Sequence, residues 1–373
     1  MRLADLDLPQ ESSAWRLESI PELDDAKTVE NLCVYYLSRV ISRAQAWIQT
    51  HRQDLLENQS VRWSVNVGVP VEYCDSPALD RFNQVLSLAW LLNYTSFDEP
   101  LTLQSLNQII EQLQYWHSQK FDGKLDCETT PEISAAVWSF LSSRQAQDGF
   151  YTFFDVGDGT LDGASFHFSR AGNGEQPHVD FYSGRVKPLG VTVLLQQAAS
   201  EIRISPDTLR LELFTQTTNS GSGLYHKIKR STVHRHVQQL IGEVVMNGHE
   251  GHKRLHPTVF KADMGQKLRV FIAGGGGKTD FYQNTIQNTH QDFQQDRAGI
   301  PAYQIKQIPV PRELLMNGIN RCEFHRFAVA YGLSIPHWEG AIIRLPSQLE
   351  VDSPPTQPTI ESATKYEDTR DLC

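Results

Sequence analysis

Apolar residues recur along this chain with two different spacings. A helical spacing predicts α-helices in several stretches: residues 28–53, 77–93, 102–118, 131–141, 191–199 and 321–332. Alternating or continuous apolar runs predict strands in others: 61–71, 150–154, 164–168, 177–190, 268–273 and 303–310. Strand, turn and helix follow one another twice, around 61–93 and around 268–290. This alternation predicts an α/β fold.

The composition narrows the function classes. The 373-residue chain carries a net charge of −10 and shows no basic patch, which argues against nucleic-acid binding. No apolar run is long enough to span a membrane, and the acidic N-terminus lacks the apolar core of a secretory signal. The five cysteines form no C-x-x-C pair, which is typical of a reducing compartment. We therefore expect a cytoplasmic protein that binds neither nucleic acid nor membrane.

One turn between two predicted strands carries more acids than a turn requires. It reads Asp155-Val156-Gly157-Asp158-Gly159-Thr160-Leu161-Asp162. Gly157 and Gly159 would let backbone N–H groups approach an anion, and Thr160 would bond a terminal phosphate. Asp155 and Asp162 would hold a hydrated Mg²⁺ ion. The pattern favours the phosphates of a nucleotide with its metal, and a tight hairpin with solvated acids is the alternative.

A glycine loop follows the predicted strand at 268–273. Its residues are Gly274, Gly275, Gly276, Gly277 and Lys278. Consecutive glycines cost chain entropy unless a ligand or another backbone must approach closely. An adenine or ribose ring across the glycines would be such a ligand, with Lys278 adding a charge. A plain strand-to-helix connection is the alternative, because the spacing is not that of a G-x-x-x-x-G-K-[ST] phosphate loop.

A single carboxylate opens the predicted helix at 131–141. Glu132 lies in its first turn, where the helix dipole favours a negative charge. The same position would let it orient a water molecule if the helix points at the phosphates.

Together these pieces resemble the ATPase domain of DnaK-type heat-shock chaperones, a branch of the actin-like superfamily. The acidic hairpin resembles that family's D-x-G-G-G-T-x-D loop, and residues 132–137 resemble its E-P-T-A-A-A helix. "FIAGGGGKTDFY" resembles its adenosine loop, and the segments 76–90 and 326–334 resemble its crossing helices. The motifs stand in the family's order, from about Thr28 to Ile335.

The resemblance implies an actin-like ATPase fold: two lobes of related β/α units around a cleft that binds ATP or ADP with Mg²⁺. It implies that Asp155 and Asp162 hold the metal's waters, that Thr160 contacts the γ-phosphate and that Glu132 positions the attacking water. The expected nucleotide-binding set is Gly157, Asp158, Gly159, Thr160, Gly274, Gly275, Gly276, Gly277 and Lys278. The expected segments are a polar one at 1–27, a partial first lobe at 28–150, a second lobe at 151–344 and a disordered tail at 345–373.

The sequence departs from the family in three ways. The family's first phosphate hairpin, D-x-G-T, and its lysine are absent, so the strand at 61–68 would have a bare edge unless a protein partner or the N-terminal segment covers it. Asp158 stands where the family has glycine, and no peptide-binding domain follows. We expect a chaperone-like nucleotide-binding protein that hydrolyses ATP only if the missing hairpin is supplied. A non-catalytic actin-like scaffold or interaction module is the alternative.

A group of histidines offers a second kind of site. His249, His252 and His256 recur at i, i+3 and i+7, so they would share one helix face and could bind Zn²⁺. Gly248 and Gly251 weaken that helix, and no carboxylate or cysteine in the segment completes a ligand set. A polar surface helix is therefore the favoured interpretation.

Overall fold

The computed structural model describes residues 1–9, 12–15, 20–57, 60–97, 101–120, 125–170, 176–215, 227–263, 265–336 and 339–349. Its α-helices are α1 (Ala26–His51), α2 (Gln53–Leu56), α3 (Val71–Cys74), α4 (Ala78–Asn93), α5 (Leu103–Lys120), α6 (Glu132–Leu141), α7 (Val191–Ile202), α8 (Pro206–Thr215), α10 (Thr232–Leu255), α11 (Pro257–Asp263), α12 (Asp280–Asp292) and α13 (Ala328–Leu333). Its 3₁₀ turns are η1 (Arg2–Asp5), η3 (Pro21–Asp24), η4 (Gln295–Ala298), η5 (Arg321–Arg326) and η7 (Pro346–Gln348). Its strands are β1 (Val65–Val69), β2 (Cys127–Pro131), β3 (Gly149–Val156), β4 (Leu161–Ser169), β5 (His178–Lys187), β6 (Leu268–Ala273), β7 (Tyr303–Lys306) and β8 (Ile342–Arg344). The predicted α/β class is confirmed.

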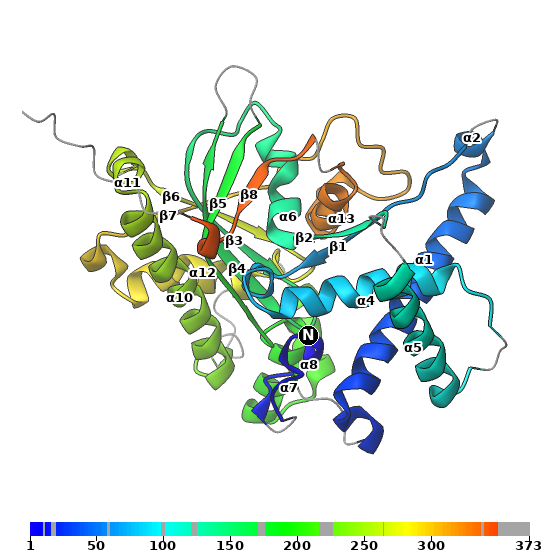
Figure 1. The fold of residues 1–373 in the computed structure, drawn as a ribbon. Helices are drawn as coiled ribbons and strands as arrows, with labels where there is room; N and C mark the ends of the chain where they lie inside the picture. Colours follow the sequence, from blue (N-terminus) through cyan, green and yellow to red (C-terminus); the bar gives the residue numbers. More distant parts are fainter. Residues whose placement is uncertain are drawn as a thin grey trace, which may run out of the picture.

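A six-stranded mixed sheet forms the larger part of the molecule (Figure 1). Its order is β7-β6-β3-β4-β5-β8. The segment β3-β4-β5 is an antiparallel meander, and β6 and β7 lie parallel to β3. The parallel strands β3 and β6 therefore end at the same edge of the sheet, where the acidic hairpin and the glycine loop both begin.

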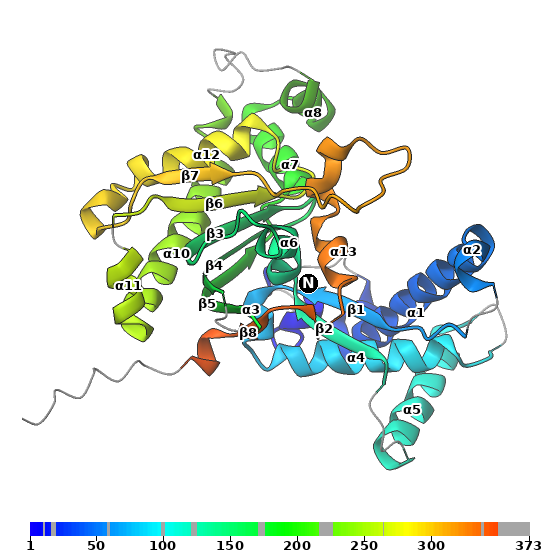
Figure 2. The same cartoon turned by 90° about the horizontal axis from the view of Figure 1, so that it is seen from above.

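Helices cover both faces of this sheet. The face that carries Phe154, Val156 and Leu161 packs against α7, α10 and α12. The opposite face, which carries Tyr151, Phe153 and Phe166, packs against α6 and α13. Because side chains alternate along a strand, neighbouring positions of β3 and β4 supply both cores. Figure 2 shows α6 and α13 between the large sheet and the strands β1 and β2.

A smaller unit contains β1 and β2. These strands form a parallel two-stranded sheet, with Val65 opposite Cys127 and Val69 opposite Pro131. Helices α1, α4 and α5 bury a third core beside it. Within the described residues β1 has one ladder partner, so its other edge carries no strand. The prediction that a protein partner covers this edge stays a prediction.

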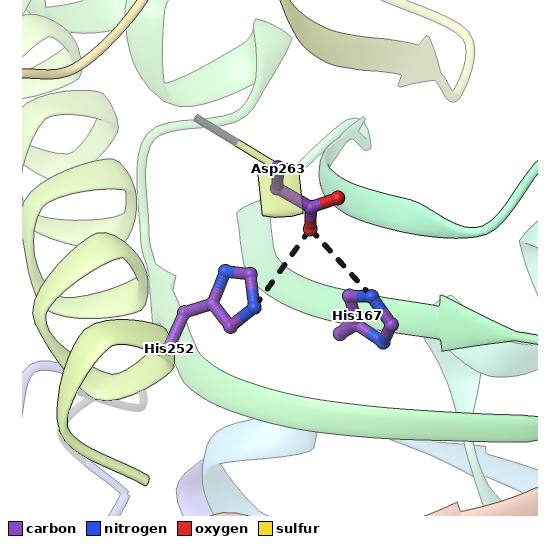
Figure 3. A group of neighbouring side chains, drawn as sticks. All are labelled: His167, His252 and Asp263. Atoms are coloured by element: carbon purple, nitrogen blue, oxygen red, sulfur yellow. Dashed lines mark ion pairs between the residues drawn. The ribbon is translucent and has the colours of Figure 1, made fainter. Parts of the chain in front are cut away.

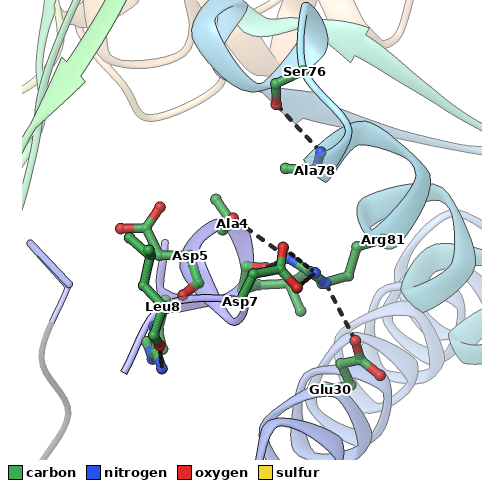
Figure 4. Close-up of polar contacts among 10 residues, drawn as sticks. Ala4, Asp5, Asp7, Leu8, Glu30, Ser76, Ala78 and Arg81 are labelled. Atoms are coloured by element: carbon green, nitrogen blue, oxygen red, sulfur yellow. Dashed lines mark hydrogen bonds and ion pairs between the residues drawn. The ribbon is translucent and has the colours of Figure 1, made fainter. Parts of the chain in front are cut away.

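The N-terminal segment lies against α4 rather than extending a sheet. Figure 4 shows Arg81 of α4 at the centre of its contacts. The Arg81 guanidinium donates to the carbonyl of Leu3 at 2.9 Å and to the carboxylate of Asp7 at 2.9 Å, and it lies 3.3 Å from Glu30 of α1. Trp15 donates through Nε1 to the hydroxyl of Tyr73 at 2.8 Å. One partly buried arginine thus joins the N-terminal turn to two helices.

Near the C-terminus the structure differs from the predicted elements in two places. The single helix expected at 321–332 is a 3₁₀ turn followed by α13, because the carbonyls that would continue the helix are used elsewhere. The carbonyl of Cys322 accepts from Lys278 Nζ, and that of His325 accepts from the N–H of Gly274 at 3.3 Å. The strand β8 lies inside the segment that the helical and extended patterns leave unassigned, and it pairs with β5.

Two expectations concern regions that the structure covers only in part. The expected disordered tail lies, from residue 350 onward, outside the described residues. In the described ranges, no helix combines the length and the apolar character needed to cross a bilayer.

Candidate acidic site at the ends of β1, β2 and β3

The β3–β4 hairpin places two of the predicted acids face to face. Asp155 and Asp162 are Cα partners in the antiparallel ladder, one residue from the turn. Directly opposed residues of an antiparallel pair project to the same face of the sheet, so the two carboxylates share one environment. That face is the one covered by α6. The Asp162 side chain is buried, with 1% of its surface exposed, whereas Asp155 is partly buried.

Two further acids approach from the smaller unit. Glu132 is the first residue of α6 and directly follows β2. Glu72 lies in α3, just beyond the end of β1, and its Oε2 accepts from the N–H of Val186 at 2.8 Å. The site therefore gathers carboxylates from the carboxyl ends of parallel strands, which is where α/β sheets present ligand-binding groups.

The electrostatics of the cluster are one-sided. Burial, reinforced by the negative charge of Glu132, raises the pKa of Asp155 from 3.8 to about 7. Burial also raises the pKa of Asp162 well above its usual value. A hydrogen bond with Glu132 and the negative charges of Glu132, Asp155 and Glu72 raise it further. Every charged group that shifts these two pKa values is an acid. Four acids with no compensating base favour either bound protons or a bound cation.

The environment of the Asp162 carboxylate shows what the cluster lacks. Within the described residues its oxygens have no ordinary hydrogen-bond donor, and the neighbouring Glu132 carboxyl can bond Asp162 only by sharing a proton with it. A buried charged group without a partner costs several kcal/mol, so such a group calls for a proton or a metal. The atoms of the cluster that could bind a metal are all carboxylate oxygens, which is the ligand type that Mg²⁺ prefers. The residues present therefore fit the magnesium that the sequence predicts here.

The hairpin turn is anchored to the beginning of α7. The carbonyl of Asp158 accepts from the N–H of Thr192 at 2.7 Å, and its carboxylate accepts from the Thr192 hydroxyl at 2.9 Å. The carbonyl of Gly157 accepts from the N–H of Val191 at 3.1 Å. Asp158 is thus held at a helix N-terminus, where the dipole favours its charge.

The same contacts leave backbone donors free in the turn. In the described part of the chain, the N–H groups of Asp158, Gly159 and Thr160 make no backbone hydrogen bond. A Cβ atom built on Gly159 would meet nothing within 4 Å. The turn therefore has N–H groups without a backbone acceptor, although that of Thr160 is packed against Gly190. Such N–H groups suit an anion where a ligand can reach them.

The glycine loop is packed more tightly than a loop that only receives a ligand. Gly274 has a φ of +79°, and a Cβ there would collide with Asp155 Oδ1 and the carbonyl of Val156. The N–H of Gly276 donates to that same carbonyl at 3.0 Å, and a Cβ on Gly277 would collide with the carbonyl of Ala273. Close approach to β3 therefore explains most of the glycine run.

Two positions of the loop have a different environment. Gly275 has open space where its Cβ would lie, so it alone among the four glycines faces an unfilled volume. Lys278 donates through Nζ to the carbonyl of Cys322. Its ammonium is thus engaged by η5, away from the free donors of the turn.

Sequence reasoning missed one acid of the cluster. Glu72 follows Pro70 at the end of β1, in the same position after a strand that Glu132 takes after β2. That shared position, directly after a strand, was the signal in the sequence that could have identified Glu72. The predicted histidine set lies elsewhere, on α10 and just beyond its end.

Comparison with known proteins gives a fold-level result. No protein-family model and no curated protein matches the sequence. Among solved structures, the chain is similar to a non-polymerisable quadruple mutant of pCBH ParM, with 13% identity, 72% of this chain and 66% of that chain covered, and a TM-score of 0.37. It is also similar to MreB5 of Spiroplasma citri bound to AMPPNP, with 14% identity, 63% and 64% coverage, and a TM-score of 0.33. A third is the ethanolamine utilization protein EutJ from Carboxydothermus hydrogenoformans, with 16% identity, 56% coverage of each chain and a TM-score of 0.29.

The chain spans between 56% and 66% of the lengths of these solved structures, so each superposition is partial. The site is argued from the side chains of this chain alone.

Proposed function

We propose that this chain binds ATP or ADP together with Mg²⁺ at the acidic site. The observation that carries the proposal is the buried Asp162 carboxylate, which lies opposite Asp155 and is influenced by acids only. Two facing carboxylates without a base need either a proton or a cation between them, and we propose that Mg²⁺ takes this place when nucleotide binds. A metal held there would lie beside the free N–H groups of the hairpin turn.

Each predicted residue has a role in this proposal. Asp155 and Asp162 hold the hydrated metal, and Mg²⁺ would neutralise the phosphate charge beside them. The donors of Gly159 and Thr160 receive the phosphates, and Glu132 orients a water molecule between the two units. The adenosine lies over Gly275, which faces open space.

In this proposal the chain binds the nucleotide and hydrolyses ATP little or not at all. Phosphoryl transfer depends on positive charge around the phosphate, and the charges that act on Asp155 and Asp162 are all negative. Lys278 is held by the Cys322 carbonyl. The non-catalytic interaction module, the alternative drawn from the sequence, is compatible with this state. The chaperone branch of the family rests on the sequence motifs alone.

A nucleotide titration with and without Mg²⁺ tests the proposal. We expect calorimetry to show ATP or ADP binding to the wild-type chain that depends on Mg²⁺. Asp162→Asn should lose this dependence, because the amide keeps the shape of the side chain and removes the charge. Asp148→Asn is the matched control, since Asp148 lies beyond the far end of β3, where it accepts from the N–H of Arg170 at 3.0 Å. Equal affinity in the Asp162→Asn variant and the wild type would contradict the assignment.

A further inference from the structure

A second buried cluster lies at the opposite end of β4 from the acidic site (Figure 3). It consists of His167 of β4, His252 of α10 and Asp263 at the end of α11. Along β4, His167 is five residues beyond Asp162, or roughly 17 Å at the usual rise per residue. It also points to the other face of the sheet, toward α10. The two clusters are therefore independent of each other.

The spacing of the cluster does not suit hydrogen bonds. His167 Nε2 lies 3.6 Å from Asp263 Oδ2, and His252 Nε2 lies 3.8 Å from the same oxygen. Hydrogen bonds between such groups normally measure about 2.7–3.2 Å. Two ligands of a tetrahedral zinc ion, each about 2.1 Å from the metal, lie about 3.4 Å apart. All three candidate ligand atoms lie within 4.8 Å of one another, so the distances are close to those of a shared metal.

Two of the three candidate ligand atoms lack a hydrogen-bond partner. Within the described residues, neither Nε2 of His252 nor Oδ2 of Asp263 has a hydrogen-bond partner. His252 is 1% exposed and His167 is 7% exposed. Buried polar groups without partners point to a missing ligand.

The surrounding packing holds His252 in place. Its ring stacks on Phe150 at a centroid distance of 5.0 Å and on Tyr182 at 4.9 Å. Gly248 and Gly251 face Ser165 and Tyr182 of the sheet, and a Cβ at Gly248 would collide with Ser165. The two glycines, which the sequence suggested would weaken the helix, instead let α10 lie close against the sheet. That close approach brings His252 to the carboxylate that the histidine motif lacked.

A small cavity adjoins the cluster. It has a volume of about 80 Å³, and its lining includes His252, Asp263, His249 and Phe260. A water molecule needs only about 10–15 Å³ of such space. The cavity therefore has room for a non-protein ligand next to the three side chains.

We propose that His167, His252 and Asp263 form a binding site for a divalent transition-metal ion of the Zn²⁺ class, with a fourth coordination position open to this cavity. Two imidazole nitrogens and one carboxylate oxygen are a known zinc ligand set, and three protein ligands with an open position are typical of sites that keep a water molecule. The metal would link α10 and α11 to β4.

Zinc titration of the full-length chain, prepared without a polyhistidine tag and treated with a chelator, tests the site. We expect calorimetry to show one tight equivalent of Zn²⁺ per chain. Asp263→Asn and His167→Gln should each weaken binding by more than about a hundredfold, since even outer-shell changes cost 10–100-fold. His249→Ala is the matched control, because His249 lines the same cavity without belonging to the ligand set.

Two further measurements keep the test decisive. Circular dichroism and the urea midpoint of Asp263→Asn, a near-isosteric change, should match those of the metal-free wild type, so that lost binding is not lost folding. The visible d–d spectrum of the Co²⁺-loaded chain should change when azide is added, since azide would take the open position. Absence of tight Zn²⁺ binding to the wild type, or wild-type affinity in Asp263→Asn, would overturn the site. A Co²⁺ spectrum that azide leaves unchanged would overturn the open position.

Discussion

Asp155 and Asp162 oppose each other across the β3–β4 ladder, on the face that α6 covers with Glu132 at its first residue. Like charges directly opposite one another destabilise a sheet, and no base lies among the groups that shift their pKa values. The two facing acids of the hairpin therefore destabilise the metal-free fold, and this effect can be measured in unfolding experiments.

The first consequence concerns stability without metal. Asp162→Asn should raise the free energy of unfolding of the chelator-treated chain by about 1 kcal/mol at neutral pH, because it removes a buried acid whose charged neighbours are all acids. Urea unfolding followed by circular dichroism measures this. A variant that is less stable than the metal-free wild type would show that the carboxylate has a partner in solution.

The second consequence is a pH dependence. Because the pKa of folded Asp155 is about 7, against an ordinary value of 3.8, the folded chain retains a proton that the unfolded chain has lost between these values. The contribution of Asp155 to the free energy of unfolding is therefore complete below about pH 4, falls as the pH rises toward 7, and is constant above that.

Unfolding in urea at about pH 5 and about pH 8 should reveal this component. It should be present with chelator and reduced by Mg²⁺, which replaces the proton. The Asp155→Asn variant should lack it. A metal-free wild type and an Asp155→Asn variant with the same pH profile would refute the assignment.

The glycine loop allows a paired test of packing against binding. Gly275→Val should leave stability nearly unchanged, since open space surrounds that position, and should weaken nucleotide binding by placing a branched side chain where the ring is proposed to lie. Gly274→Val should instead destabilise the fold by about 1–3 kcal/mol, because the backbone φ of +79° and the contact with Asp155 both disfavour a side chain. Thermal unfolding and nucleotide titration of both variants separate the two effects. Undiminished binding in Gly275→Val would identify the loop as a connector.

A fourth prediction concerns turnover. We expect the purified chain to release phosphate from ATP at the background rate, because Lys278 is engaged by Cys322 and the cluster adds negative charge beside the phosphates. A phosphate-release assay of the wild type and Asp155→Asn checks this. Mg²⁺-dependent release that disappears in the variant would establish hydrolysis and correct the proposal.

A fifth prediction concerns the N-terminal turn. Arg81→Ala should lower the free energy of unfolding by about 1.5–3 kcal/mol, because a mostly buried guanidinium loses its bonds to Leu3 and Asp7 together. Arg52→Ala is the matched control, since its pair with Asp54 is exposed to solvent and such pairs contribute little to stability. Equal effects in urea unfolding would mean that the N-terminal turn adds nothing to the fold.

Local patterns in the sequence predicted the elements that depend on neighbouring residues. The helix at 77–93 is α4 within one residue, and the hairpin that carries Asp155 and Asp162 has the expected turn. Helical period, strand alternation and turn chemistry act over a few residues, so a single sequence contains them. For the same reason, the sequence placed Glu132 on the first turn of its helix.

The tertiary structure alone decided which distant side chains meet. Glu72 joins Asp162 because β1 ends beside the large sheet, and no local pattern encodes that position. His252 lies beside His167 and Asp263, rather than acting with His249 and His256, because two glycines let α10 close on the sheet. The helix expected at 321–332 breaks for a similar reason, since its carbonyls bond the glycine loop. Contacts between segments far apart in the chain depend on packing and on competition for hydrogen bonds, and both are set only when the whole chain is folded.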